Sequence, residues 1–174
     1  MNKYIILLRG INVSGKNKLP MQELRSMLND LGYKNVETYI QSGNIILDTE
    51  ESKNSIASKV KESIQSKFGY DVPVVIRTVE EWETTIENNP YPVNEEKKLY
   101  FTFLNEAPQN IEIEVNGAKD DEFTIWKDVV YLHCLGGYGK TKLSNNLFEK
   151  KLKVIATSRN YRTTMKLLEL AKKI

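Results

Sequence analysis

Hydrophobic residues in the first part of the chain recur with two periods, which predict a strand and then a helix. The run Tyr4–Leu8 is apolar throughout and is typical of a buried strand. From Met21 to Leu31 apolar residues recur at helical spacing, with Pro20 before them and Gly32 after them. These residues therefore predict a first strand followed by a helix.

The pattern then returns to strand-like runs. Val36–Ile40 and Ile45–Leu47 flank a Gln-Ser-Gly-Asn turn and predict a hairpin. A helix is expected from Ser52 to Phe68, and Val72–Arg77 predicts the next strand. Residues 3–77 thus predict the order βαββαβ, the ferredoxin-like unit in which two helices cover one face of an antiparallel sheet.

The rest of the chain repeats this order with little residue identity. Thr78, with Glu81 after it, predicts the start of a short helix, and Lys98–Leu104 predicts a strand. Residues 108–117 fit either a strand or a helix, and we favour a helix because a second hairpin, Phe123–Trp126 with Val129–His133, follows them.

A helix from Ser144 to Leu152, a short extended piece at 154–156 and a final helix from Asn160 to Lys173 complete the pattern. We therefore predict an α+β protein with two ferredoxin-like halves that are alike in pattern, each built on an antiparallel sheet. The predicted domains are an N-terminal half at 1–78, a linking helix and Pro-rich turn at 79–96, and a C-terminal half at 97–174.

Several predicted strands are apolar on both sides, Tyr4–Leu8 and Tyr100–Leu104 among them. An antiparallel sheet with one wet face would instead alternate apolar and polar residues. We therefore expect the second face of each sheet to be covered as well, by packing of the two halves or by a homodimer.

Composition excludes several classes of protein. The single cysteine, Cys134, rules out an internal disulfide, and the single histidine, His133, leaves no imidazole cluster for a metal. No apolar run approaches the length of a membrane span, and the N-terminal run is too short for a signal peptide. We expect a cytoplasmic protein that carries no cofactor and does not enter a membrane.

The charged residues are distributed unevenly along the chain. Residues 1–35 carry six Lys and Arg against two acidic residues, residues 36–137 carry nine against nineteen, and residues 138–174 carry ten against two. Two basic ends thus flank an acidic middle, which favours an anionic partner. Lysines that merely solvate terminal helices would give the same count.

Three polar stretches could hold an anion. The first is the glycine-punctuated loop Arg9–Lys18, and the second, Gly136–Lys142, resembles the end of a P-loop but has Cys134 where its first glycine would stand. The third is Thr157–Thr163, where Thr157 or Ser158 would cap the last helix and Arg159, Arg162 and Lys166 would share one helical face. An anion there would relieve the positive charge in the first turn.

Catalytic patterns are sparse. His133 and Cys134 are neighbours in a predicted strand, so their side chains point to opposite faces and cannot form a base and nucleophile pair. A buried thiol and a histidine at an edge or hairpin are expected instead. No pair of carboxylates stands out as an acid and base couple.

Three stretches together resemble the signatures of the bacterial family catalogued as domain of unknown function 1697: Leu8–Asn17, Tyr39–Asn44 and Thr157–Thr163. Ser14 stands where the family usually has glycine, and Tyr161 where it usually has tryptophan. The stretch Gly137–Leu143 is similar to the family's Gly-x-Gly-Arg-Ser-Lys-Leu, with Lys140 and Thr141 as departures. The resemblance runs nearly end to end and implies a fold but no activity; its signature residues are the polar loop positions described above.

We therefore predict an anion-binding site for a phosphate-bearing small molecule or a nucleic acid, drawn from both halves, in which Arg9 and Lys16 lie within reach of Arg159 and Arg162. An interaction or dimerisation module and a small-molecule enzyme with an Arg, Asn and backbone-amide clamp stay open as alternatives. The residues predicted to bind the anion are Arg9, Gly10, Asn12, Gly15, Lys16, Asn17, Gln41, Ser42, Gly43, Asn44, Gly139, Lys140, Arg159, Asn160 and Arg162.

Overall fold

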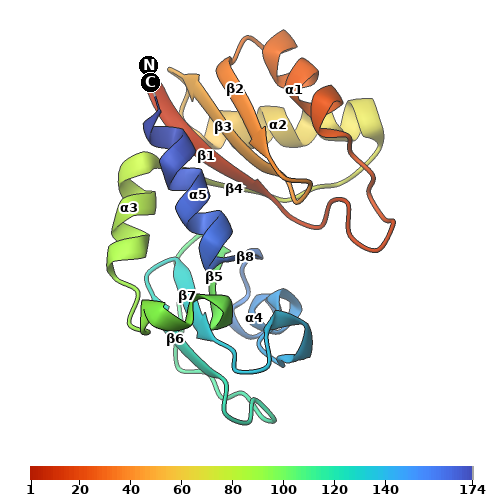
Figure 1. Ribbon diagram of the computed structural model, residues 1–174. Helices are drawn as coiled ribbons and strands as arrows, with labels where there is room; N and C mark the ends of the chain where they lie inside the picture. The colour runs from red at the N-terminus through yellow and green to blue at the C-terminus, as the bar shows by residue number, and fades with distance from the viewer. Residues whose placement is uncertain (174) are drawn as a thin grey trace. The chain divides into compact units, whose positions relative to one another are not determined.

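The computed structural model describes residues 1–173 and divides into two compact units, each built around one four-stranded antiparallel sheet (Figure 1). The first unit holds residues 1–84 together with Leu167 and the residues after it, and the second holds residues 85–166. The boundaries fall inside two helices, α3 (Val79–Glu87) and α5 (Tyr161–Lys172). The predicted α+β fold class with two similar halves is confirmed.

The first unit follows the predicted βαββαβ order. Its strands run in the order β2-β3-β1-β4, so that β1 is central and pairs antiparallel with β3 and β4. The helices between the strands have the ends that the sequence predicts. The elements are β1 (Asn2–Leu8), α1 (Met21–Asp30), β2 (Lys34–Tyr39), β3 (Asn44–Thr49), α2 (Lys53–Phe68) and β4 (Val74–Thr78).

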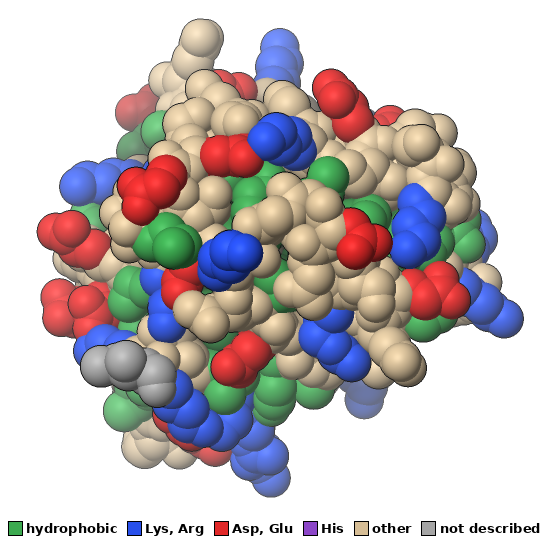
Figure 2. Space-filling view, turned by 90° about the horizontal axis from the view of Figure 1, so that it is seen from above, with side chains coloured by type: hydrophobic (Ala, Val, Ile, Leu, Met, Phe, Trp, Pro, Cys, Tyr) green, Lys and Arg blue, Asp and Glu red, His purple; other side chains and the backbone are tan. Residues whose placement is uncertain are grey.

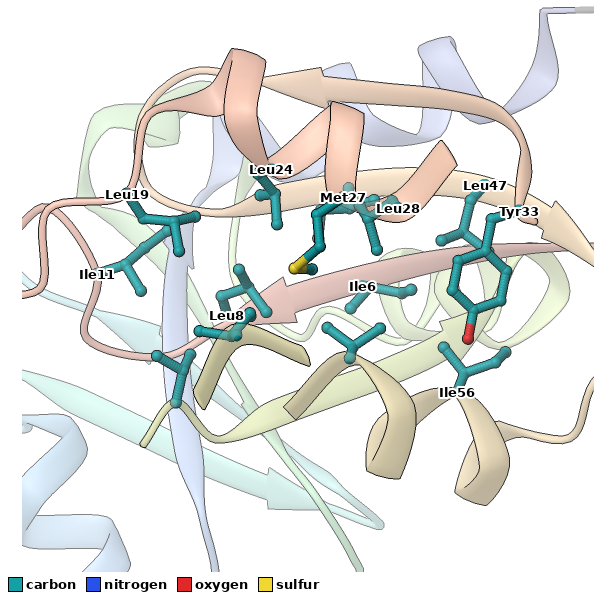
Figure 3. Packing of buried hydrophobic residues seen from close by; sticks show 14 of the residues in the cluster. Ile6, Leu8, Ile11, Leu19, Leu24, Met27, Leu28, Tyr33, Leu47 and Ile56 are labelled. Atoms are coloured by element: carbon teal, nitrogen blue, oxygen red, sulfur yellow. The ribbon is translucent and has the colours of Figure 1, made fainter. Parts of the chain in front are cut away.

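The main hydrophobic core of this unit lies between one face of the sheet and the helices α1 and α2 (Figure 3). Leu24 and Leu28 of α1 project toward Ile6 and Leu8 of β1, and Ile56 of α2 closes the cluster from its other side. All five side chains are fully buried. Their helical spacing brings them to one face, which explains why the pattern in the sequence predicts this layer well.

The second unit contains the 3-10 segment η1 (Val93–Lys98), β5 (Leu99–Leu104), β6 (Glu122–Trp126), β7 (Val129–His133), the 3-10 turn η2 (Tyr138–Lys140), α4 (Asn145–Leu152) and β8 (Ala156–Asn160). Its sheet has the order β6-β7-β5-β8, the counterpart of the first sheet. A single helix, α4, covers the face on which the first sheet carries two. Phe148 and Leu152 of α4 pack there against Leu104, Val130 and Leu132.

Our preference for a helix at residues 108–117 is wrong, because the chain has no regular helix or strand between β5 and β6. Ile113 and Val115 pack against the core of the second unit, whereas Ile111 is exposed. The alternation of these three residues thus marks an extended segment that lies on the core without pairing with a strand. Pro108 and Gly117, taken as helix boundaries, instead flank a loop.

The two sheets agree in the register of their strands. Tyr4 lies opposite Thr78 in the first sheet as Tyr100 lies opposite Asn160 in the second. In each sheet the outer hairpin strand keeps the same pairing as well, since Tyr39 opposes Asn44 and Trp126 opposes Val129. The likeness of the halves therefore extends from the order of elements to individual strand positions.

The start of the last helix differs from its prediction. Thr157 and Ser158 belong to strand β8, and neither caps α5. The Asn160 side chain does so instead, because its Oδ1 accepts a hydrogen bond from the backbone N–H of Thr163 at 2.8 Å. Thr78 and Glu81 form the predicted capping box before α3, each side chain accepting from the other's backbone N–H.

The second face of each sheet is also buried at strands β1 and β5, as their apolar residues predict. Ile5 and Leu7 alternate with the core residues of β1, and Phe101 and Phe103 alternate in the same way along β5. All four side chains are at most 1% exposed. None of the helices in residues 1–173 has the length and apolar character that crossing a membrane requires.

Candidate functional site

The β1–α1 loop, residues 9–20, is held in place by two asparagine side chains. The Asn12 Nδ2 donates to the carbonyl oxygens of Leu19 at 3.0 Å and Gln41 at 2.8 Å, and its Oδ1 accepts from the N–H of Leu19 at 2.8 Å. The Asn17 Nδ2 donates to the carbonyl of Gly10 at 3.0 Å. Both amides that we predicted to contact an anion therefore bind backbone groups of the loop itself, and the Asn12 amide also binds the turn at Gln41.

These bonds bring the first two signature stretches together within the first unit. The turn at residues 40–43 packs against the end of β1, where the N–H of Leu8 donates to the carbonyl of Gly43 at 2.8 Å. The Asn44 Nδ2 donates to the carbonyl of Tyr39 at 3.0 Å and to the Ser42 hydroxyl at 2.9 Å. The loop and the turn thus form one polar cluster at the end of the first sheet.

Gly43 is required by a close approach. It has φ +84°, and a Cβ added there would lie 2.7 Å from the Leu8 Cβ and 2.8 Å from the Ile11 Cδ1. Gly10 and Gly15 also have positive φ, but a Cβ at either would meet no atom within 4 Å. Gly43 therefore has a steric role in addition to its backbone conformation.

Ile40 begins the same turn in a strained conformation. Its φ is 50°, in the left-handed region that β-branched residues rarely adopt, and its side chain is 48% exposed. We expect Ile40→Asn to raise the free energy of unfolding by about 1 kcal/mol, since asparagine tolerates this region and little apolar burial is lost. Urea denaturation checks it. An equal gain from Ile111→Asn, at a similarly exposed isoleucine without positive φ, would contradict this explanation.

Two of the three cations of the β1–α1 loop face the solvent, whereas Arg9 is half-buried. Lys16 and Lys18 are exposed and form no ion pair with any residue in the described part of the chain, and no acidic residue occurs between Arg9 and Glu23. Figure 2 shows one face of the protein, on which Lys and Arg side chains occur among Asp and Glu side chains. Within its own stretch of sequence the positive charge of the loop is not neutralised by an acidic residue.

In the second unit, a hydroxyl network joins the other two signature stretches. The Ser158 Oγ lies 2.6 Å from the Thr102 Oγ1 and donates to the Asn145 Oδ1 at 2.6 Å. The Tyr138 hydroxyl lies 3.3 Å from the Ser158 Oγ and accepts from the N–H of Asn145 at 3.2 Å. Tyr138 comes from the glycine-rich stretch 136–142 and Ser158 from 157–163, so the fold brings both stretches to the face that α4 covers.

Our prediction assigned no role to Tyr138 or Asn145, and it gave Ser158 a different one, as a possible cap of the last helix. The alternation of residues along a strand could have indicated the position of Ser158. Once residues 156–160 are read as a strand, Ser158 and Asn160 fall on one face and Thr157 and Arg159 on the other. A polar pair on a face that also carries apolar residues would have pointed to a buried hydrogen-bonded network.

Next to this network lies a small hollow of about 190 Å³, lined by Glu96, Lys97, Tyr100, Asn160 and Arg162. Its Tyr100 ring packs against Tyr138 at a centroid distance of 5.3 Å, and the Tyr100 hydroxyl accepts from the N–H of Tyr138 at 3.3 Å. Arg162 stands in the first turn of α5, which has no acidic residue. The hollow therefore combines two cations with the positive end of a helix dipole.

Glu96 is the one carboxylate at the hollow among the residues that line it. Its Oε1 lies 3.7 Å from the Arg162 guanidinium, and the two side chains are 46% and 75% exposed. A pair at that distance and exposure contributes little to stability, so a ligand could displace it at small cost.

Two residues of the predicted site lie elsewhere. Arg159 belongs to β8 rather than to a helix face and is 7% exposed, and its guanidinium donates to the Thr157 Oγ1 at 2.8 Å. Burial lowers the pKa of Arg159 to about 10. Lys140 lines a different hollow of about 280 Å³ beside Asp120 and Asp121. The predicted sharing of one helical face by Arg159 and Arg162 is therefore wrong.

The predicted residues thus fall into two groups, one in each unit. Residues 9–17 and 41–44 belong to the first unit, and Gly139, Lys140, Arg159, Asn160 and Arg162 belong to the second. The approach of Arg9 and Lys16 to Arg159 and Arg162 would join the two units and stays a prediction.

The cysteine and the histidine occupy the environments that the sequence predicts. Cys134 is fully buried in the core beneath α4, and burial raises the pKa of its thiol to about 11, so it is no nucleophile at neutral pH. The His133 Nε2 lies 3.0 Å from the Glu95 Oε2, and its ring stacks on Tyr91. Across residues 1–173 no cluster of His, Cys, Asp and Glu has the geometry of a metal site.

Comparison with known proteins places the chain in a family but assigns it no activity. The model of the family described as "Protein of unknown function (DUF1697)" matches residues 1–131. A solved structure of a conserved bacterial protein from Streptococcus pneumoniae is 27% identical, with a TM-score of 0.72 over 98% of this chain and 99% of that one. None of the curated proteins matches the chain.

Proposed function

Since the chain belongs to this family of unknown function, its function has to be inferred from its own geometry, and we propose that it binds a phosphate-bearing ligand. The observation that carries the proposal is the hollow in the second unit, where Lys97, Tyr100, Asn160 and Arg162 converge at the N-terminus of α5. A phosphate there would meet two cations and the helix dipole, features that proteins commonly use for this group, while the Tyr100 hydroxyl already donates to the Lys97 carbonyl at 3.3 Å.

The local chemistry favours phosphate over a metal or an apolar ligand. Lys97 and Arg162 outnumber the single carboxylate of Glu96, and the carboxylate is well exposed. The Tyr100 ring is fixed by its contact with Tyr138, so a ligand would not have to order it. The volume of about 190 Å³ suits one phosphate group with part of the molecule that carries it, and the rest would extend into solvent.

The exposed lysines of the β1–α1 loop belong to the first unit and are a separate group of cations. Lys16 and Lys18 carry no partner charge within the described residues and would contact phosphates of a nucleic acid independently of the hollow. If several phosphates are neutralised, affinity should fall steeply with salt, whereas a single phosphate in the hollow gives a shallow dependence.

Calorimetric titration with inorganic phosphate, pyrophosphate and nucleoside monophosphates tests the proposal directly. We expect Arg162→Ala to weaken the binding of these ligands at least about tenfold, because it removes the bidentate donor and about 1.4 kcal/mol of binding free energy. Lys150→Ala is the matched control, since Lys150 is an exposed cation on α4 that does not line the hollow.

The two variants differ by one positive charge each from the native protein, so an effect of net charge alone would weaken binding equally in both. Equal weakening would contradict a site at the hollow. So would the absence of any binding by the native protein at millimolar concentrations of all three ligands.

A further inference from the structure

Strand β6 is an open edge of the second sheet. It ends the strand order β6-β7-β5-β8 and pairs with β7 alone among the described strands. The two-residue turn at Lys127 and Asp128 closes the hairpin with Trp126 opposite Val129. In a hairpin with a two-residue turn, the residues that flank the turn form a hydrogen-bonded pair, and every second residue does so after them. The backbone N–H and C=O groups of Trp126 and Thr124 therefore face β7, and those of Phe123 and Ile125 face outward.

The corresponding edge of the first sheet is protected and β6 is not. Strand β2 contains a register shift between Lys34 and Glu37, and Asn35 within it has φ 49°. Such a bulge twists an edge away from regular pairing. The pairing of β6 with β7 runs without a shift from Glu122 to Trp126, so its outward groups form a regular row.

The outward groups of Phe123 and Ile125 fix how a second copy of β6 would pair. In an antiparallel pair related by a two-fold axis, residues with outward groups must oppose one another. With the axis at Thr124, Phe123 comes opposite Ile125 of the other copy. The outward N–H and C=O groups of both residues are then all hydrogen-bonded. Two residues beyond this pair in each direction, Asp121 of one copy comes opposite Lys127 of the other.

Charge complementarity selects the second copy as the occupant. In this register each Asp121 carboxylate comes opposite a Lys127 ammonium, twice in the pair. Glu122 comes opposite Trp126, whose ring carries the Lys127 ammonium at 4.7 Å from its centroid. Phe123 and Ile125, both half-buried, would extend their apolar face across the junction.

We propose that two copies of the chain associate through their β6 strands, antiparallel about Thr124, to form a continuous eight-stranded sheet. This surface is independent of the proposed phosphate site. The contact is small, because each strand contributes five residues, so we expect a reversible dimer with a dissociation constant in the micromolar range.

A charge exchange tests the register. Asp121→Lys alone sets two ammonium groups against each other in both contacts, and Lys127→Glu alone sets two carboxylates against each other there. Each variant should therefore weaken dimerisation at least about tenfold in sedimentation velocity. In a heterodimer of the two variants, both contacts again pair opposite charges. At one contact the unchanged Asp121 and Lys127 side chains meet, and at the other the two substituted side chains meet. We therefore expect a fluorescently labelled Lys127→Glu variant to form a heterodimer when unlabelled Asp121→Lys is added.

Lys150→Glu on α4 is the control for net charge and should dimerise like the native chain. Because the Asp121 Oδ1 also accepts from the N–H of Leu135 at 2.9 Å, circular dichroism must show that Asp121→Lys is folded. If Asp121→Lys is not folded, Thr124→Lys provides the weakening test, because it sets two ammonium groups opposite each other on the axis. Asp120→Lys cannot serve instead, because Asp120 does not come opposite Lys127 in this register. A native protein that stays monomeric to about 1 mM, or a dimer that all these changes leave intact, would overturn the proposal.

Discussion

Replacing Gly43 with alanine is expected to lower the free energy of unfolding by about 3 kcal/mol. The new Cβ would stand 2.7 Å from the Leu8 Cβ, an atom attached to the central strand of the first sheet, so one of the two backbones has to shift. Overpacking of this kind costs about 1–3 kcal/mol, and alanine at positive φ adds about 1–2 kcal/mol. The smaller entropy of the unfolded chain offsets under 1 kcal/mol.

Gly10→Ala separates the two causes. Gly10 has φ +74°, close to that of Gly43, but its Cβ would meet nothing within 4 Å. It should therefore cost about 1 kcal/mol, the backbone contribution alone. Chemical denaturation of both variants measures the difference, and equal losses would show that the contact with Leu8 has no steric cost.

A second large effect is expected at Asn12. Its side chain makes three hydrogen bonds, two to Leu19 and one to Gln41, and its φ is 54°. Asn12→Ala leaves the part-buried backbone groups of Leu19 and the exposed carbonyl of Gln41 without this partner and places alanine in the left-handed region. We expect the free energy of unfolding to fall by about 3 kcal/mol.

Asn12→Gly shares the loss of the hydrogen bonds but carries no Cβ at positive φ, so it should cost about 2 kcal/mol. Thermal and urea denaturation of the pair give both values. If Asn12→Ala were as stable as the native protein, the side chain would have no structural role, and direct contact with a ligand would become the better explanation for Asn12 in the signature loop.

The sequence predicted the first half well because its elements have clear boundaries. Ser52 and Gly69 carry the cap geometry expected of them, and Leu24 and Leu28 lie on the buried face of α1 as their spacing requires. Local rules suffice where each helix has both an apolar stripe and a capping residue. The same rules identified the capping box at Thr78.

The errors lie where tertiary contacts override local pattern. Residues 108–117 have boundary residues typical of a helix, but their isoleucine and valine side chains pack on the second core in extended chain. At residues 157–160, polar residues occupy a strand in which Thr157 and Arg159 are buried and Ser158 is half-buried, so the hydrophobic signal of a strand is missing. Arg159 could be placed there only through its pairing with Phe101.

The candidate site was predictable in part. The contact between the loop at Asn12 and the turn at Gln41 agrees with their grouping in the sequence, although their asparagines serve the backbone. Asn160 and Arg162, which charge and position at a helix start single out, do line the hollow, and their role in binding stays a prediction. Tyr100 could not be found in this way, because it reaches the hollow through the pairing of β5 with β8, which no local pattern specifies. Lys97 reaches the hollow from η1, just before β5, where the sequence predicted only a turn.

The equal register of the two sheets shows how little of this fold depends on particular residues. Apart from the bulge in β2, paired strand positions correspond without insertion or deletion, whereas the connections differ: the turn at 40–43 is longer than its counterpart at 127–128, and α1 has no helical counterpart after β5. Two largely different sequences therefore specify the same strand pairing, and the chain can change what lies between the strands without changing the sheet. The loop at 9–20 and the turn at 40–43 are such a local difference, because the first half has them and the second half does not.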